Sequence, residues 1–209
     1  MVRRTKAEAD ATRQALLDAA EDVFHEKGVG RASLAEIAQA AGATRGAIYW
    51  HFKDKVDLFN AMMDRVTLPL EAACRRPDAA GDPLARVQGT IQSLLAIAVE
   101  DAHTRRVFEI AMYRVEYVAE LGGVRERHEA SLKRFHARLT NDLALAAREQ
   151  SLTLPMAHAD AALGLQALFD GLLQTWILGS TPFDLQRVGA DAVAAYLRGL
   201  GYRLQGDMR

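Results

Sequence analysis

The sequence has almost no cysteine and no long apolar run. Its single cysteine, Cys74, excludes an intramolecular disulfide and is typical of a reducing compartment. The first residues lack the apolar centre of a signal peptide, and no uninterrupted apolar stretch reaches the roughly 18 residues that a membrane span needs. We therefore expect a cytoplasmic protein with no membrane partner.

The sequence also contains little proline, and its positive and negative charges nearly balance. The 209 residues include only 5 Pro, half of them are apolar and 25% are charged, so the chain is predicted to be folded and long enough for a large core or two domains. The formal net charge is −1. Because such a chain has no overall attraction to a polyanion, any contact with nucleic acid must depend on local basic patches.

Motifs of catalysis and metal binding are missing as well. The six histidines, at positions 25, 51, 103, 128, 136 and 158, form no His-Glu-x-x-His pair. There is no glycine-rich phosphate loop and no Gly-x-Ser-x-Gly nucleophile turn. We expect no enzyme activity, no metal and no cofactor. A small helical enzyme or a small-molecule-binding protein remains the alternative. Turnover of a small molecule by the purified protein would favour the enzyme.

What the sequence does contain is helical periodicity throughout, without strand alternation. It predicts an all-α fold of about nine helices, with a three-helix N-terminal head followed by a helical body. The clearest break is the segment Arg-Arg-Pro-Asp-Ala-Ala-Gly-Asp-Pro. The helices are expected at about 6–27, at 33–52 as a pair, from Asp54 towards 75, and at 84–100, 103–120, 124–150 after a Gly122-Gly123 turn, 156–178 and 184–202.

Residues 33–52 carry the start and stop signals of two short helices. Ser33 and Glu36 form a capping-box pattern, and Gly42 supplies the left-handed residue that ends the first helix. Thr44 is placed to cap the second helix. Two short helices joined by a tight turn that contains glycine form the helix-turn-helix that places its second helix in the major groove of DNA.

The second helix of this pair has an unusual outward face. Ala47 and Ile48 supply its inward side, which leaves Tyr49 and Trp50 pointing outwards. Aromatic residues at helical spacing more often pack in a core, and that interpretation stays open. A Tyr-Trp-His run between basic residues nevertheless favours contact with a polyanion.

The stretch Thr-Arg-Gly-Ala-Ile-Tyr-Trp-His-Phe-Lys-Asp-Lys at 44–55 resembles the recognition-helix signature of the TetR family of bacterial transcriptional regulators. It is most similar to the AcrR-like and TtgR-like repressors of multidrug efflux operons. Further islands of resemblance are Arg105-Arg106 with Glu109-Ile110, Asp170-Gly171-Leu172 with Trp176, and Phe183-Asp184-Leu185.

This resemblance implies a homodimeric repressor that binds a palindromic double-stranded operator and is released by a drug-like, aromatic or cationic inducer. It implies a DNA-binding domain at 1–55 and a ligand-binding and dimerisation domain at 56–209. A TetR-type regulator of lipid or quorum-signal metabolism is the alternative.

DNA recognition requires residues that position the protein and residues that read bases. Arg45 is the candidate for a guanine edge, and Gly46 allows close approach. Tyr49 either contacts a phosphate or packs on a thymine methyl group. Trp50 either contacts DNA or supports the helix. The two N-terminal arginines either enter the minor groove or form a solvated tail. The complete predicted set, in which the other members contact phosphates, is Arg3, Arg4, Ser33, Thr44, Arg45, Gly46, Tyr49, Trp50, His51, Lys53 and Lys55.

A mixed apolar, aromatic and acidic set in the body suits drug-sized cations and aromatic molecules. Its positions match those lining the inducer pocket of resembling efflux repressors. Ordinary core packing is the alternative for each member. The predicted ligand-binding residues are Val66, Leu95, Phe108, Met112, Glu116, Leu132, Phe135, Leu139, Gln166, Phe169 and Asp170.

The last two helices carry more apolar surface than one body can easily bury. A four-helix interface with a second copy explains this surface, and a well-filled core is the alternative. The predicted interface residues are Leu172, Leu173, Trp176, Val188, Val193, Tyr196 and Leu197. The fourth helix is predicted to be the only element that touches both the head and the ligand site.

Overall fold

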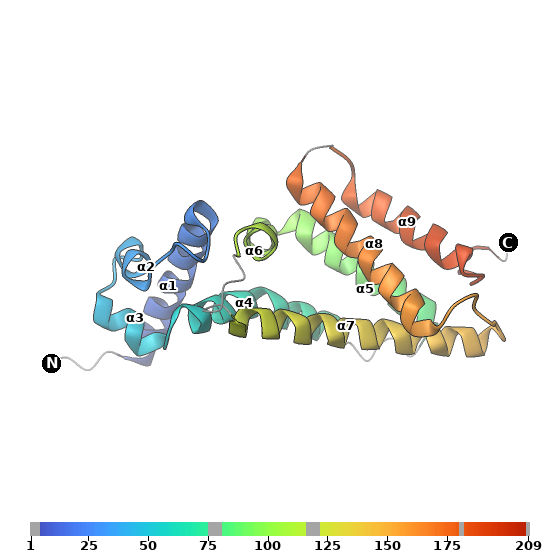
Figure 1. The fold of residues 1–209 in the computed structure, drawn as a ribbon, viewed down its shortest axis with the longest axis horizontal. Helices are drawn as coiled ribbons and strands as arrows, with labels where there is room; N and C mark the ends of the chain where they lie inside the picture. Colours follow the sequence, from blue (N-terminus) through green and yellow to red (C-terminus); the bar gives the residue numbers. More distant parts are fainter. Residues whose placement is uncertain (1–4, 75–80, 116–121, 180–181, 208–209) are drawn as a thin grey trace. The chain divides into compact units, whose positions relative to one another are not determined.

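The computed structural model describes residues 5–74, 81–115, 122–179 and 182–207, without the side chains of 69–74, 122–124 and 128. These residues form nine α-helices and no strand (Figure 1), which confirms the all-α prediction. Arg3, Arg4 and Glu116, all predicted to be site residues, lie outside the described part. The helices are α1 (Lys6–Lys27), α2 (Leu34–Ala40), α3 (Arg45–His51), α4 (Lys55–Cys74), α5 (Pro83–Glu100), α6 (Ala102–Tyr113), α7 (Gly122–Glu149), α8 (His158–Leu178) and α9 (Leu185–Gly199).

The chain divides into two compact units, and each unit is made of two segments that are separate in the sequence. The first unit comprises 1–69 and 103–128, and the second comprises 70–102 and 129–209. Helices α4 and α7 therefore contribute residues to both units. The functional boundary after residue 55 stays a prediction, since α6 belongs to the same compact unit as the helix-turn-helix.

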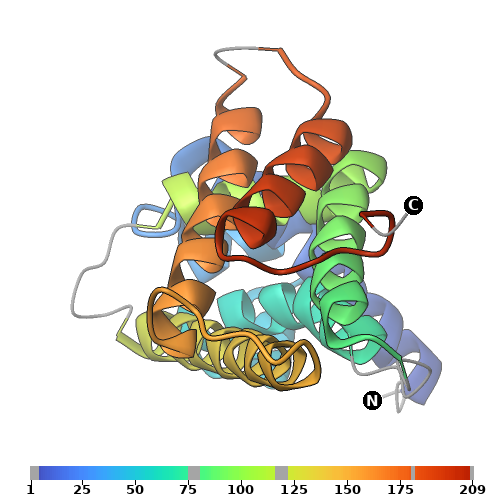
Figure 2. The same cartoon turned by 90° about the vertical axis from the view of Figure 1, so that its right-hand side faces the viewer.

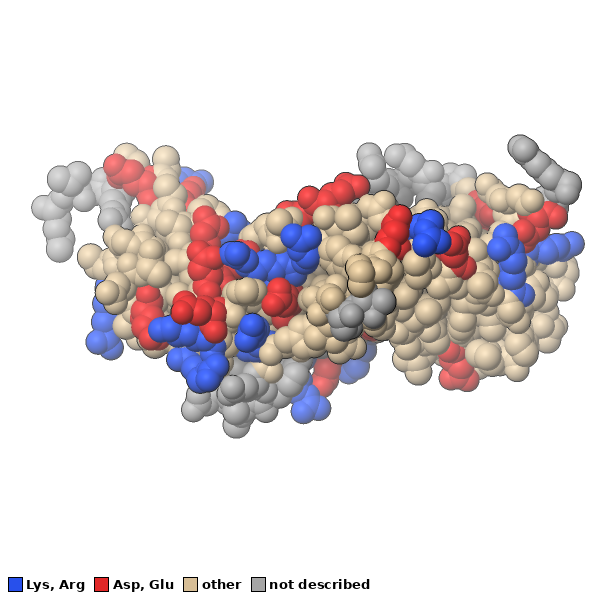
Figure 3. Space-filling view, turned by 90° about the horizontal axis from the view of Figure 1, so that it is seen from above, with Lys and Arg blue, Asp and Glu red and all other residues tan. Residues whose placement is uncertain are grey.

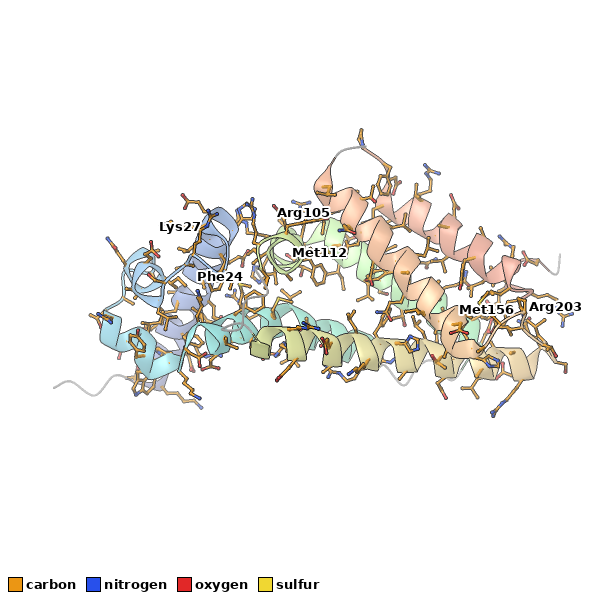
Figure 4. All side chains as sticks on the ribbon, in the orientation of Figure 1. Phe24, Lys27, Arg105, Met112, Met156 and Arg203 are labelled. Carbon is orange, nitrogen blue, oxygen red and sulfur yellow. The ribbon has the colours of Figure 1, made fainter. Side chains whose placement is uncertain are left out.

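In the first unit, α1 is the central helix of the helix-turn-helix head. Its buried residues include Leu16, Leu17 and Phe24, none of which has exposed surface. The ring of Phe24 lies 6.0 Å from that of Phe59 on α4, so an aromatic pair joins these two helices (Figure 4). This packing fixes the platform on which α2 and α3 are held.

The predicted start and stop signals around α2 and α3 are confirmed. Ser33 and Glu36 form the reciprocal capping box of α2, and the hydroxyl of Thr44 accepts from the backbone of Ala47 at the start of α3. Gly42 has a φ of 63°, the left-handed conformation that glycine adopts without strain. Asp54 accepts from the backbone of Asp57 at 2.8 Å. Each signal is local, which is why the sequence predicts it well.

In the second unit, α9 packs against both α5 and α8 (Figure 2). Two glycines allow this close approach. A Cβ on Gly189 would collide with Cδ1 of Leu95, and a Cβ on Gly164 would collide with the hydroxyl of Tyr196. The same hydroxyl donates to the carbonyl oxygen of Ala161 at 2.9 Å and so ties α9 to α8.

Two helix boundaries differ from the predictions. Helix α6 ends at Tyr113, although the pattern predicted a helix to about 120, of which residues 116–120 lie outside the described part. Helix α7 begins at Gly122, where a turn was predicted. Glycine costs less in a first turn than in a helix interior, because the first N–H groups have no partner within the helix.

Candidate nucleic-acid interface and ligand site

Helix α3 has one inward and one outward side, as predicted. Ile48 and Phe52 are buried, whereas Tyr49 is 51% exposed and Trp50 is 73% exposed. The guanidinium of Arg45 lies over the ring of Tyr49, 5.9 Å from its centre. Core packing is therefore excluded for Tyr49 and Trp50, and the exposed face of α3 combines a cation with two large aromatic rings.

The basic residues of the first unit fall into two classes. Lys27 pairs with Glu36 at 2.9 Å, and Arg65 pairs with Asp18 at 2.6 Å. Within the described part of the chain, Arg45 has no carboxylate partner, and neither does the side chain of Lys53. The face shown in Figure 3 mixes Lys and Arg with Asp and Glu. Arg45 and Lys53 are therefore cations beside α3 that no described carboxylate neutralises.

Lys55 has a structural role that was not predicted, and its predicted phosphate contact stays a prediction. Its ammonium donates to the carbonyl oxygens of Gly30 at 2.7 Å and Ala32 at 3.0 Å. These bonds tie the start of α4 to the segment before α2. The side chain is thus a brace within the first unit, and a phosphate contact, if made, uses only its remaining N–H.

The helix caps hold Ser33 and Thr44 at the starts of α2 and α3. Hydrogen bonds from Lys27 and from Ser33 lower the pKa of Glu36 to about 2, so this carboxylate stays ionised and keeps Ser33 in the cap. The phosphate contacts predicted for Ser33 and Thr44 remain predictions, as does that of His51, which is half-buried.

A polar contact between α1 and α6 was not predicted. Its three side-chain pairs are Glu21 with His103 at 2.6 Å, Asp22 with Arg106 at 2.6 Å, and His25 with Glu109 at 3.2 Å. In addition, the backbone N–H of Val29 donates to the carbonyl oxygen of Arg114 at 2.8 Å. Burial raises the pKa of Glu21.

The prediction that the fourth helix is the only element to touch both the head and the predicted ligand residues is therefore wrong, because α6 carries Phe108 and Met112 and also contacts α1. Helical periodicity does not indicate the α1–α6 pairs. Their partners lie 84 residues apart in the chain for two of them, and charged residues on a polar helix face predict only exposure to solvent.

The predicted ligand residues are divided between the two units. In the first unit, Val66 is buried, Phe108 is half-buried and Met112, on α6, is 38% exposed (Figure 4). In the second unit, Leu95 is wholly buried against Gly189 and serves the packing of α5 on α9, so its predicted place in the ligand site stays a prediction.

The remaining ligand residues of the second unit include an aromatic pair beside a polar pair. The rings of Phe135 and Phe169 lie 5.9 Å apart, on α7 and α8. Gln166 is buried and bonds to Asp170, yet its Oε1 atom has no hydrogen-bond partner among the described residues. Burial raises the pKa of Asp170 to about 6, against the opposing effect of the bond to Gln166.

Such a group can recognise a particular kind of molecule. The aromatic faces suit a flat or cationic ligand, the free amide oxygen suits a hydrogen-bond donor, and the carboxylate of Asp170 suits a cation. Leu132 and Leu139 lie on the same helix as Phe135. Leu132 is half-buried and Leu139 is buried.

The predicted dimer residues lie partly inside the second unit. Leu173, Val193 and Leu197 are at most 3% exposed in the single chain, so they are core residues and do not form an outer face. The hydroxyl of Tyr196 is likewise used within the chain. The partly exposed members of the set are Leu172, Trp176, Val188 and Tyr196.

Two exposed residues of α8 were missed. Leu163 is 57% exposed and Leu178 is 59% exposed. Among the described helices, α8 alone has the length and apolar composition of a membrane span. Its most apolar 18 residues have a mean hydropathy of 1.3, and 28% of this stretch is buried. The apolar composition of α8 was visible in the sequence, whereas its poor burial within its own chain is seen only in the structure.

Comparison with known proteins identifies relatives along most of the chain. The profile described as "Bacterial regulatory proteins, tetR family" matches residues 16–62, and that described as "MAATS-type transcriptional repressor, C-terminal region" matches 82–202. The HTH-type transcriptional regulator TtgR of Pseudomonas putida is 36% identical over 187 residues, which cover 88% of this chain and 89% of TtgR.

Solved structures agree with this result. NalD, described as the secondary repressor of the MexAB-OprM multidrug efflux pump in Pseudomonas aeruginosa, matches with a TM-score of 0.82 at 35% identity, over 94% of this chain and 99% of that chain. A complex of SmeT with triclosan matches with a TM-score of 0.80 at 32% identity, over 95% of each chain.

Proposed function

This chain belongs to the TetR family of bacterial regulatory proteins, and we propose that it is a ligand-responsive repressor of a multidrug efflux operon. The exposed face of α3 is the observation that carries the proposal. Arg45, Tyr49 and Trp50 are presented to solvent on a helix whose other side is buried. This arrangement suits a recognition helix in the major groove.

Control of efflux follows from what the relatives are. NalD is described as a repressor of a multidrug efflux pump, and SmeT was solved in complex with triclosan. At 36% identity over most of both chains, TtgR supports the same type of regulator. We expect a cytoplasmic protein, since its target is chromosomal DNA.

A homodimer is the expected DNA-binding form. One short recognition helix reads only a few base pairs, whereas two heads about 34–36 Å apart read two half-sites of a palindrome. The exposed Leu163 and Leu178 give α8 an apolar face that a second copy would cover.

The ligand site that we propose is centred on Phe135, Phe169, Gln166 and Asp170. Its inducer would be an aromatic or cationic molecule of drug size. Release of DNA requires that this ligand bind the non-DNA conformation more tightly, because equal affinity for both conformations shifts nothing. We propose that the ligand displaces α4 and so changes the separation of the two heads in the dimer.

The test is selection of bound duplexes from a random DNA pool with the purified protein. The expected product is a palindrome with half-sites about one helical turn apart. A copy of that palindrome should lie upstream of genes for an efflux pump. Failure to enrich any duplex over random DNA would refute the proposal, and enrichment of a palindrome beside genes of lipid metabolism would replace efflux control by the alternative.

A further inference from the structure

A hollow of about 760 Å³ lies within the first unit, next to the recognition helix. It is formed by the N-terminal half of α1 and the C-terminal end of α3. Its lining residues are Thr5, Lys6, Ala9, Asp10, Arg13, Trp50 and His51. We call it the α1/α3 hollow. Only Trp50 and His51 belong to the predicted DNA-binding set, so most of the hollow has no assigned role.

Two cations of the α1/α3 hollow have no carboxylate partner in the described part of the chain. Lys6 is exposed on the first turn of α1. Arg13 is half-buried, and its guanidinium lies over the ring of Phe52, 5.2 Å from the ring centre. Since Phe52 is itself buried, the stacking holds the Arg13 charge in a fixed position.

Trp50 gives the α1/α3 hollow an apolar wall. Its indole is 73% exposed and meets the ring of His51 edge-on, at 4.6 Å between ring centres. An indole that remains exposed beside unpaired cations suits a partner with an apolar face and regularly spaced negative charges. The sugar-phosphate backbone of DNA has both, because each deoxyribose presents carbon atoms between two phosphates.

We propose that the α1/α3 hollow binds the sugar-phosphate backbone of the operator next to the bases that α3 reads. Arg13 and Lys6 neutralise a phosphate, and the indole of Trp50 packs on the adjoining sugar. This inference rests on the proposed DNA-binding function and extends it to residues of α1. Charge complementarity sets the occupant, since an apolar protein partner would leave both cations unpaired.

Asp10 also lines the α1/α3 hollow, and its carboxylate opposes the phosphate. It is exposed, so its repulsion is screened and weakens the contact without preventing it. Asp10→Asn should therefore raise operator affinity, whereas Arg13→Gln should lower it. Opposite signs from two neighbouring substitutions are not expected if the residues only support the fold.

The test is a fluorescence-anisotropy titration of the selected operator at several salt concentrations. Loss of one neutralised phosphate lowers the slope of log affinity against log salt by about 0.9, which corresponds to roughly eightfold weaker binding at 0.1 M salt. We expect this result for Arg13→Gln and a similar one for Lys6→Gln. Arg13→Lys should keep most of the wild-type slope, because it keeps the charge.

Arg148→Gln is the matched control, since Arg148 is an exposed arginine at the end of α7 in the other unit. It should leave both affinity and slope unchanged. Thermal unfolding of each variant separates lost contact from lost structure. If Arg13→Gln and Lys6→Gln both bind with the wild-type affinity and slope, the inference is wrong.

Phosphate ethylation locates the contact on the DNA. Wild-type protein should show interference at a phosphate flanking each half-site, and Arg13→Gln should lose interference at that phosphate alone. An unchanged interference map would overturn the inference even if affinity falls. If the wild-type protein selects no operator at all, the proposed function fails and this inference fails with it. If the wild-type protein selects an operator and the variants bind it with the same affinity and slope, this inference fails and the proposed function stands.

Discussion

Among single residues, Arg45 is the one that we propose reads a base. Its charge is free and it lies over Tyr49 on the exposed side of α3. Arg45→Ala should cost about 1–3 kcal/mol of operator binding and relax the preference at one base pair in each half-site. Anisotropy titrations against operators substituted at every position would measure this. Unchanged discrimination at all positions would remove Arg45 as a reader.

Lys55 should act on stability more than on DNA binding. Lys55→Ala removes two hydrogen bonds from a charged donor to the carbonyls of Gly30 and Ala32, so we expect a loss of about 1–3 kcal/mol in the free energy of unfolding. Lys53→Ala is the comparison, because that side chain is exposed and unpaired. It should leave unfolding unchanged and flatten the salt dependence of DNA binding by about one unit. The opposite pattern in urea and salt titrations would restore the phosphate role to Lys55.

Asp170 should make stability depend on pH. Its pKa is raised from 3.8 to about 6 by burial, so its contribution to stability is present in full below pH 3.8 and is lost as the pH rises through 6. Asp170→Asn avoids this loss. We expect the variant to exceed the wild type by on the order of 1–2 kcal/mol at pH 8, less than the full shift because part of the side chain meets solvent. At pH 4.5 the difference should fall to about a third of that value, because the loss has only begun. Calorimetry at both pH values would show it, and equal melting temperatures at pH 8 would contradict it.

At the scale of helices, the sequence predicts what is decided locally. The capping box of Ser33, the left-handed Gly42 and the buried stripe of α1 all depend on residues within a few positions of one another. The end of α6 and the α1–α6 ion pairs depend on partners far along the chain, so periodicity alone does not reveal them.

The two candidate sites also differ in how much of each the sequence predicts. The DNA-binding surface was predictable because α3 is one short helix whose inward and outward sides follow from its period. The ligand residues come from several helices, and helical spacing does not tell a core leucine from a pocket leucine. Leu95 shows the difference, because only the contact with Gly189 places it in the packing of α5 on α9.

The approach of α5 to α9 depends on that glycine. Gly189→Ala would place a methyl group against Leu95 and should cost about 1–3 kcal/mol of stability, because a packed interior responds to added volume by strain. Gly171→Ala on α8 is the matched control, since nothing lies near its added Cβ. It should be neutral or slightly stabilising. Urea unfolding of both variants gives the comparison, and equal effects would mean that the close approach is unimportant.

At the scale of the whole molecule, we propose that a DNA-binding surface is coupled to a ligand site. Helices α4 and α7 contribute to both compact units, and α6 carries Phe108 and Met112 as well as the contacts to α1. We propose that α4 and α7, which continue from one unit into the other, are the routes by which binding at one site alters the other. Coupling of about 1–3 kcal/mol would weaken operator binding by roughly 5- to 150-fold.

The most direct test is a pair of titrations with a cationic fluorescent dye and the selected operator. Operator affinity is measured with and without saturating dye, and dye affinity is measured with and without saturating operator. Thermodynamic linkage requires the two ratios to be equal, so we predict that dye weakens operator binding at least fivefold and that operator weakens dye binding by the same factor. If dye and operator both bind and neither changes the affinity of the other, the ligand site is not the switch and the account of this protein as a ligand-released repressor is wrong.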